Sequence, residues 1–215
     1  MATTSVAAVH SESTNRNESE LILAARKGDL DAFNQLVLAY QDRIHNLAAR
    51  ILGDTDTAED ITQNTFLTAY LNLPRFRNGS FRSWLYRIAT NACYDLYRRH
   101  KRYPVVSIES EELAEERFVA LNDISGTRFL PETEVEKHEI VLDVQKALSQ
   151  LDMDQKAVVV LVDIQDVDYQ EAAHILRIPV GTVKSRLARA RMRLRQLLDH
   201  SITVDMPLDG RSVFM

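Results

Sequence analysis

The apolar residues recur every three or four positions along most of the chain between residues 20 and 199, and this spacing restricts the fold more than any other feature. Such a period is typical of amphipathic helices that bury one face. No alternating strand pattern occurs beyond the run AVVVLV at 157–162, which is flanked on both sides by helical spacing. The sequence therefore predicts an all-α fold.

Breaks in this period divide the chain into two helical parts. Gly28, Gly53 and Pro74 interrupt the first part, and glycine and proline are the usual residues where helices end. A fourth helix is predicted from about Ser80 to Arg102, followed by Pro104. We expect a disordered lead (1–18), a four-helix N-terminal domain (19–103), a flexible linker (104–138), a C-terminal domain of four short helices (139–199) and a tail (200–215).

The charges are segregated, although the net charge is only −5. Residues 75–102 hold eight Lys or Arg against one acid, and residues 177–195 hold seven against none. Between them, residues 104–136 hold nine acids and two bases. Two basic blocks favour nucleic acid as a partner. The acidic segment fits either a solvated linker or a strand that occupies a positively lined channel.

Targeting signals are lacking in the sequence. The longest apolar run has six residues, far below the roughly 20 that cross a bilayer. The N-terminus has no basic residue before Arg16 and no long apolar stretch. The single cysteine, Cys93, excludes an internal disulfide and stands in an apolar stripe, so we expect it to be buried. These features predict a cytoplasmic protein.

Residues 169–195 have the proportions of a helix-turn-helix. An eight-residue helix, a turn at 177–180 with Pro179, and a long basic helix from Gly181 or Thr182 follow one another. In this motif the start of the second helix enters the major groove of DNA, and the alternative is a solvated basic face. The candidate residues that read bases are Thr182, Lys184, Ser185, Arg186 and Arg189.

The predicted fourth helix combines aromatic and basic residues. Bases of single-stranded DNA stack on aromatic rings, each stack contributing about 1–3 kcal/mol, while cations hold the backbone. Packing in the core is the competing interpretation for the rings of Phe81 and Trp84. The candidate residues for single-stranded DNA on this helix are Trp84, Tyr86, Arg87, Asn91 and Arg98.

Three segments together resemble the extracytoplasmic-function group of bacterial sigma factors, in the sigma-70 superfamily. AEDITQNTFLTAY (58–70) is similar to the family's core-binding helix, FRSWLYRIATNACYDLYRR (81–99) to its promoter-melting helix, and IPVGTVKSRLARARMRLR (178–195) to its upstream recognition helix. The resemblance implies a sigma-2-like first domain that melts the minus-ten element and a sigma-4-like second domain that binds the minus-thirty-five element.

The resemblance also implies partners and residue roles. Asp60, Gln63 and Phe66 would face the clamp helices of the largest subunit of RNA polymerase core, and the flap of the second subunit would be a further contact. Asn91 and the loop from Arg77 to Ser80 would hold a base flipped from promoter DNA, and unstacking that base costs a few kcal/mol. An anti-sigma factor is a further expected partner.

Two departures from the family pattern bear on these expectations. Asn64 stands where the family often has an acid. Arg177 stands where the turn often has glycine, so a left-handed backbone there would cost about 1–2 kcal/mol.

Two other classes of function compete with this interpretation. A free-standing helix-turn-helix regulator would bind duplex DNA without polymerase, but it leaves the aromatic and basic fourth helix unexplained. An enzyme is disfavoured, because the sequence holds no GxxxxGK[ST], HExxH, CxxC or GxSxG motif. The six histidines show no metal-ligand spacing, so neither a cofactor nor a metal is expected.

Overall fold

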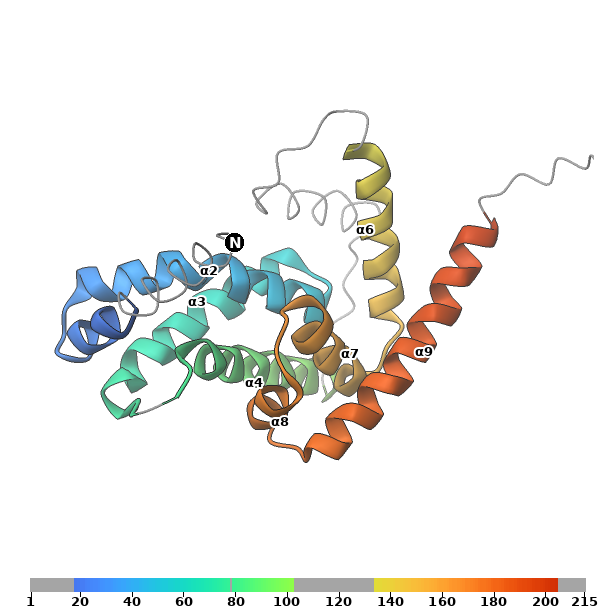
Figure 1. Ribbon diagram of the computed structural model, residues 1–215. Helices are drawn as coiled ribbons and strands as arrows, with labels where there is room; N and C mark the ends of the chain where they lie inside the picture. Colours follow the sequence, from blue (N-terminus) through green and yellow to red (C-terminus); the bar gives the residue numbers. More distant parts are fainter. Residues whose placement is uncertain (1–17, 78, 103–133, 205–215) are drawn as a thin grey trace, which may run out of the picture.

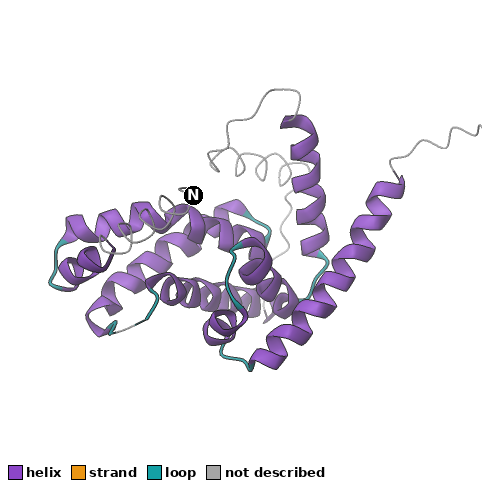
Figure 2. Ribbon diagram, in the orientation of Figure 1, coloured by secondary structure: helices purple, strands orange, loops and turns teal. Residues whose placement is uncertain are grey.

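The computed structural model of the protein describes residues 18–77, 79–102 and 134–204, and this part of the chain is built from helices (Figures 1 and 2). Residues 18–26 form the first helix. The later elements are α2 (Leu30–Leu52), α3 (Thr55–Asn72), the 3-10 turn η1 (Leu73–Arg75), α4 (Phe81–Arg102), α6 (Glu134–Ser149), α7 (Met153–Val159), the π-helical η3 (Val160–Ile164), α8 (Tyr169–Leu176) and α9 (Val180–Val204). The predicted all-α class is confirmed.

Capping residues explain where the helices of the first domain begin and end. The Asp29 carboxylate accepts a hydrogen bond from the Ala32 amide at 3.0 Å and so caps α2. Gly53 ends α2 with a left-handed φ of 82°, which glycine adopts without steric cost. Asp54 then caps α3 through the Thr57 amide at 2.9 Å. The two aspartates and the glycine fix a tight α2–α3 corner.

The first domain packs α2, α3 and α4 around one apolar core. Ile44 and Leu47 of α2, with Leu85 of α4, are fully buried there. Cys93 is buried as well, as the sequence predicts, and burial raises the pKa of its thiol to about 12. A thiol of this kind is an inert part of the core.

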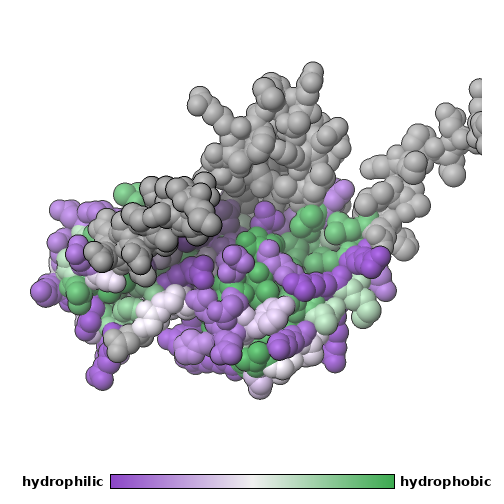
Figure 3. Space-filling model, in the orientation of Figure 1, coloured by the Kyte–Doolittle hydropathy of each residue, from purple (hydrophilic) through white to green (hydrophobic). Residues whose placement is uncertain are grey.

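The second domain packs α6, α7 and α8 against α9, which runs along the edge of the molecule in Figure 1. The segment AVVVLV crosses from α7 into η3, and its residues Val158, Val160 and Leu161 are fully buried. Burial therefore outweighs the strand preference of the β-branched residues. On the face that Figure 3 shows, hydrophilic residues predominate and apolar residues are visible in patches between them.

Several predicted boundaries change. Helix α6 begins at Glu134, inside the range assigned to the linker. The sequence did not show this start, because the polar residues there give no apolar period. Helix α4 begins at Phe81, one residue later than predicted. Helix α9 begins at Val180, one or two residues earlier than predicted, and runs to Val204, inside the predicted tail (200–215). The first helix begins at Glu18, the last residue of the predicted lead (1–18). The rest of the lead (1–17), of the linker (104–133) and of the tail (205–215) lies outside the described residues.

The two domains share one continuous apolar core, because α8 packs against α4 and the α7–η3 segment packs against α2. The sequence predicts two domains but contains no signal for this contact. Among the described residues, no helix is long and apolar enough to span a membrane.

Candidate nucleic-acid interface

Helix α4 presents the basic and polar face that the sequence predicts, with one part open to solvent. The Ser80 hydroxyl oxygen accepts a hydrogen bond from the Ser83 amide at 3.1 Å and caps the helix start. Asn91 and Arg98 are exposed, and Arg87 is half-buried. Arg98 lies over the Tyr94 ring at 5.9 Å. These positions keep three of the candidate side chains available to a nucleic-acid strand.

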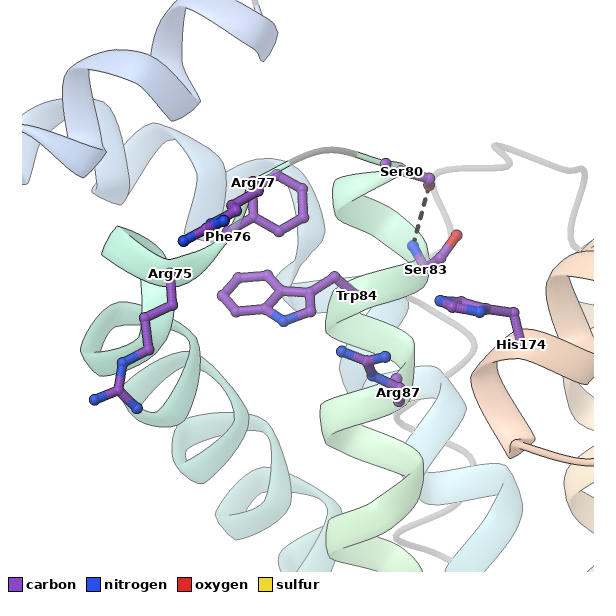
Figure 4. Close-up of a pocket in the computed structure, with 9 residues that line it drawn as sticks. Arg75, Phe76, Arg77, Ser80, Ser83, Trp84, Arg87 and His174 are labelled. Atoms are coloured by element: carbon purple, nitrogen blue, oxygen red, sulfur yellow. Dashed lines mark hydrogen bonds between the residues drawn. The ribbon is translucent and has the colours of Figure 1, made fainter.

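A cleft of about 350 Å³ lies at the start of α4, facing α8 (Figure 4). Phe76 and Trp84 form an aromatic wall with ring centroids 4.9 Å apart. The centroid of the Trp84 ring also lies 5.6 Å from that of the buried Phe81 ring, so Trp84 both packs against the core and lines the cleft. The residues that line the cleft are Arg75, Phe76, Arg77, Gly79, Ser80, Ser83, Trp84, Arg87 and His174.

The cleft gathers four of the residues predicted to bind the minus-ten element: Arg77, Ser80, Trp84 and Arg87. Asn91 lies one helical turn beyond Arg87 and is not among the lining residues. Arg75, Phe76, Ser83 and His174 line the cleft without having been predicted as site residues. The repeated arginines beside 77–80 were a signal for Arg75, whereas nothing in the sequence brings His174 here.

Tyr86 was predicted to be an exposed DNA-binding residue, and the structure contradicts this. Its side chain is buried, with 1% of its surface exposed, and its hydroxyl donates a hydrogen bond to the Gln165 side-chain oxygen at 2.8 Å. Gln165 follows η3 in the second domain. Burial raises the pKa of the Tyr86 phenol, which keeps it protonated as a donor. Tyr86 is thus a contact between domains.

Polar contacts join α4 to the second domain at two further points. The Glu171 carboxylate of α8 accepts hydrogen bonds from the Ser83 hydroxyl and from the Arg82 guanidinium, the latter at 3.0 Å. Further along α4, the Tyr94 hydroxyl donates to Asp154 at 2.9 Å. Burial, reinforced by this hydrogen bond, raises the pKa of the Tyr94 phenol above its ordinary value. The second domain therefore covers one side of α4.

The turn between α8 and α9 has the helix-turn-helix geometry. Asp168 caps α8 by accepting from the Gln170 and Glu171 amides, both at 2.8 Å. Arg177 adopts a left-handed φ of 55° and ends the helix, so the strained backbone predicted for this position is confirmed. The Thr182 amide then donates to the Pro179 carbonyl at 2.8 Å within the first turn of α9.

Helix α9 buries one stripe and exposes the other. Val183, Leu187 and Ala190 are buried against the rest of the domain. Lys184, Ser185 and Arg189 consequently point to solvent, and Thr182 is half-buried. Three of the five candidate residues on α9 are therefore open to solvent.

Two arginines of α9 are engaged within the protein. Arg186 forms an ion pair with Asp154 at 2.6 Å and is partly shielded. Arg191 forms a two-pronged contact with Asp163, with N–O distances of 3.0 and 2.5 Å. The contact with Asp163 raises the pKa of Arg191 above its already high value. To contact DNA, Arg186 would have to leave Asp154.

The face of α3 differs in one position from the prediction. Asp60 and Gln63 are exposed, but Phe66 is buried in the core at 7% exposure and cannot form an outer contact in this arrangement. Leu67 and Leu71, on the same side as Gln63, are 58% and 67% exposed. Exposed apolar residues beside polar ones are typical of a protein-binding surface. We define Asp60, Gln63, Leu67 and Leu71 as the α3 stripe.

Comparisons with known proteins match both domains. A family model described as Sigma-70 region 2 matches residues 36–103, and one described as Sigma-70, region 4 matches residues 142–194. The chain is 39% identical over 82% of its length to the ECF RNA polymerase sigma factor SigW of Bacillus subtilis, covering 94% of that protein. It is 34% identical over 86% of its length to SigM of Mycobacterium tuberculosis, covering 86% of that protein.

Two solved structures resemble the fold, each with a TM-score of 0.60 and 30% identity. One is CnrH in complex with the cytosolic domain of CnrY, which covers 86% of this chain and 98% of that chain. The other is the sigma factor RpoE of Bartonella quintana in complex with the anti-sigma factor NepR, which covers 78% and 96%. The described residues contain no group of three or more His, Cys, Asp or Glu placed to hold a metal ion.

Proposed function

Because the chain belongs to the ECF sigma factors of the sigma-70 family, we propose that it binds RNA polymerase core and directs promoter-specific initiation of transcription. The observation that carries this is the pairing, in one chain, of a region 2 domain with an arginine-rich aromatic cleft and a region 4 helix-turn-helix. The protein is then a specificity subunit rather than an enzyme, and it acts in the cytoplasm, where polymerase and promoters lie.

The α3 stripe is the surface that we assign to the polymerase clamp helices. Asp60 and Gln63 supply polar groups, and Leu67 and Leu71 supply exposed apolar area next to them. Interfaces that combine an apolar centre with a polar rim bind proteins well. Phe66 supports this surface from beneath, since it anchors α3 to the core.

The first domain melts the minus-ten element by holding unpaired bases. Trp84 and Phe76 offer ring faces for stacking, and Arg77 and Arg87 offer charge for the backbone. Asn91 lies on the open face of α4, where its amide can both donate to and accept from a base edge. Flipping a base costs a few kcal/mol, which such contacts offset.

The second domain reads the minus-thirty-five element through α9. Lys184 and Arg189 are exposed and suit guanine edges in the major groove, and Ser185 suits several bases. Thr182 and Arg186 stand on the flank of this face. Arg186 contributes once its ion pair with Asp154 is broken and its guanidinium contacts DNA instead.

The two domains must separate for both elements to be bound together. Elements centred about 25 base pairs apart lie roughly 85 Å apart along duplex DNA, at 3.4 Å per base pair. In this structure Glu171 of α8 touches Arg82 and Ser83 of α4. We therefore take the packed arrangement as a closed form of the protein and the polymerase-bound protein as an open form.

An anti-sigma factor is the further partner that we propose. A structural relative is described in complex with one, the RpoE–NepR pair. The α3 stripe is the apolar surface that such a partner would mask, in competition with polymerase.

The experiment that tests this function measures binding to core RNA polymerase and then polymerase-dependent opening of a promoter bubble. Asn91→Ala should keep core binding but lose opening, and Leu67→Asp should lose core binding. Arg189→Ala should weaken recognition of the upstream element; we choose it over Arg186→Ala because Arg186 is ion-paired within the fold. Tight, salt-dependent binding to duplex DNA without any core binding would instead favour a free-standing regulator.

A further inference from the structure

We propose that the cleft between α4 and α8 binds a free nucleoside monophosphate, which holds the two domains in the closed form. This inference goes beyond the sigma-factor function, because it concerns a small ligand of the protein away from polymerase. It rests on the charge of the cleft, on its aromatic wall and on the residue that the second domain contributes.

The arginines of the cleft lack acidic partners, unlike the other arginines at the domain contact. Arg75, Arg77 and Arg87 form no ion pair within the described part of the chain, and no Asp or Glu lines the cleft. By contrast, Arg82 is paired with Glu171 and Arg186 with Asp154. Unpaired guanidinium groups around a concave surface favour a phosphate.

The aromatic wall supplies the second half of the recognition. The rings of Phe76 and Trp84 lie 4.9 Å apart at an angle of 38°, and both are only half-buried. In Figure 4 the Trp84 indole lies between Arg75 and Arg77 on one side and Arg87 and His174 on the other. A nucleobase stacks on such a ring while its phosphate lies next to the arginines. The cleft volume of about 350 Å³ is at the small end for ligand sites, which fits one nucleotide rather than a strand.

Because of His174, residues of both domains line the site. It is the lining residue that comes from α8, and its ring points toward the cleft in Figure 4. The contacts of Glu171 with Arg82 and Ser83 hold α8 beside the cleft. A nucleotide that touches both His174 and the arginines therefore binds the closed form best and stabilises it by mass action.

The test uses the full-length protein and the fluorescence of Trp84, the one tryptophan of the chain, supported by titration calorimetry. The probes are GMP, guanosine, which lacks the phosphate, and ribose 5-phosphate, which lacks the base. We expect saturable binding of GMP and at least tenfold weaker binding of the other two, since each lacks one half of the contacts. No saturable binding of GMP at millimolar concentration, or equal binding of ribose 5-phosphate, would overturn the proposal.

Substitutions on α8 show whether GMP binds in the cleft. His174→Ala should weaken GMP binding about tenfold, the effect of one charge-assisted contact, whereas Gln170→Ala on the same helix should not. Unchanged GMP affinity in His174→Ala would overturn the two-domain site.

A competition experiment provides a second check on the location. A single-stranded oligonucleotide carrying the minus-ten sequence should compete with GMP, because both use Trp84. If GMP binds without competition, it lies elsewhere, and this result would also overturn the proposal.

Core polymerase binding is measured in parallel with the wild-type protein. A protein that fails to bind polymerase but binds GMP refutes the proposed function and leaves this inference standing. A protein that binds polymerase but does not bind GMP refutes only this inference.

Discussion

Helices α4 and α9 are both long, basic helices, but their outer faces differ in how far the rest of the protein covers them. The second domain covers one side of α4 through Glu171, Gln165 and Asp154, whereas the side of α9 that we propose to read the major groove stays open at Lys184 and Arg189. The helix that we propose to hold single strands is thus partly covered within the protein, and the helix that we propose to read duplex DNA is exposed on that side. The presence of basic residues alone does not show which helix is accessible to DNA without a rearrangement of the domains.

The largest effect that we expect comes from Tyr86, on the covered side of α4. Tyr86→Ala removes a fully buried ring and its bond to Gln165, and should lower the free energy of unfolding by about 3–5 kcal/mol. Tyr86→Phe should cost only about 1 kcal/mol, the value of the hydrogen bond. Chemical denaturation measures both. A Tyr86→Ala protein of normal stability that loses single-stranded DNA binding would restore the role predicted from sequence.

The open helix should show the opposite behaviour. Arg189→Ala should leave stability unchanged and weaken binding of the minus-thirty-five duplex by about 1–3 kcal/mol, since Arg189 is exposed and has no partner to lose within the described fold. Gel shift or anisotropy with one altered base pair at a time identifies the base concerned. A uniform loss over all sequences would make Arg189 a phosphate contact instead.

Separating the domains should remove the difference between the two helices. Glu171→Lys places a cation against Arg82 and removes the acceptor of Ser83, so the radius of gyration from small-angle scattering should increase. Binding of single-stranded minus-ten DNA should rise several-fold as α4 is uncovered, by roughly 1 kcal/mol. Glu20→Lys, an exposed charge change of equal size, is the control. An unchanged radius would show that the closed form does not depend on this contact.

The smallest effect concerns pH and the Tyr94 hydrogen bond. The folded-state pKa of Tyr94 is raised above its unfolded value of about 10, so its contribution to stability is complete below pH 10 and is lost as the pH rises further. Tyr94→Phe should therefore be less stable than wild type by about 1 kcal/mol at pH 8, with the gap closing above pH 10. A gap independent of pH would mean that packing, not the hydrogen bond, is lost.

Local sequence patterns predicted the helices and the helix-turn-helix well. Gly53, Pro179 and the apolar stripe of α9 act within one or two turns, so their effects can be read from the neighbouring residues. Phe66 could also have been placed correctly. It precedes the buried Ala69 by three positions, a spacing that places both on one face of a helix, whereas Gln63 lies toward the exposed side of α3.

The contacts between the domains could not be read in this way. Tyr86 meets Gln165 across 79 residues and Arg82 meets Glu171 across 89. Periodicity places Tyr86 beside the core stripe of α4, but whether that flank faces water or another domain depends on packing far along the chain. The same holds for His174, whose place in the cleft follows only from how α8 docks.

The covering of α4 by α8 has a consequence for how strongly the protein associates with its targets. A partner that requires the open form sees only the fraction of molecules in that form, so its apparent dissociation constant equals the intrinsic one divided by that fraction. If about one molecule in a hundred were open, a nanomolar intrinsic affinity would be measured as about a hundred nanomolar. By fixing the fraction of open molecules, the Glu171 contacts then determine how high the concentration of the protein must rise before transcription responds.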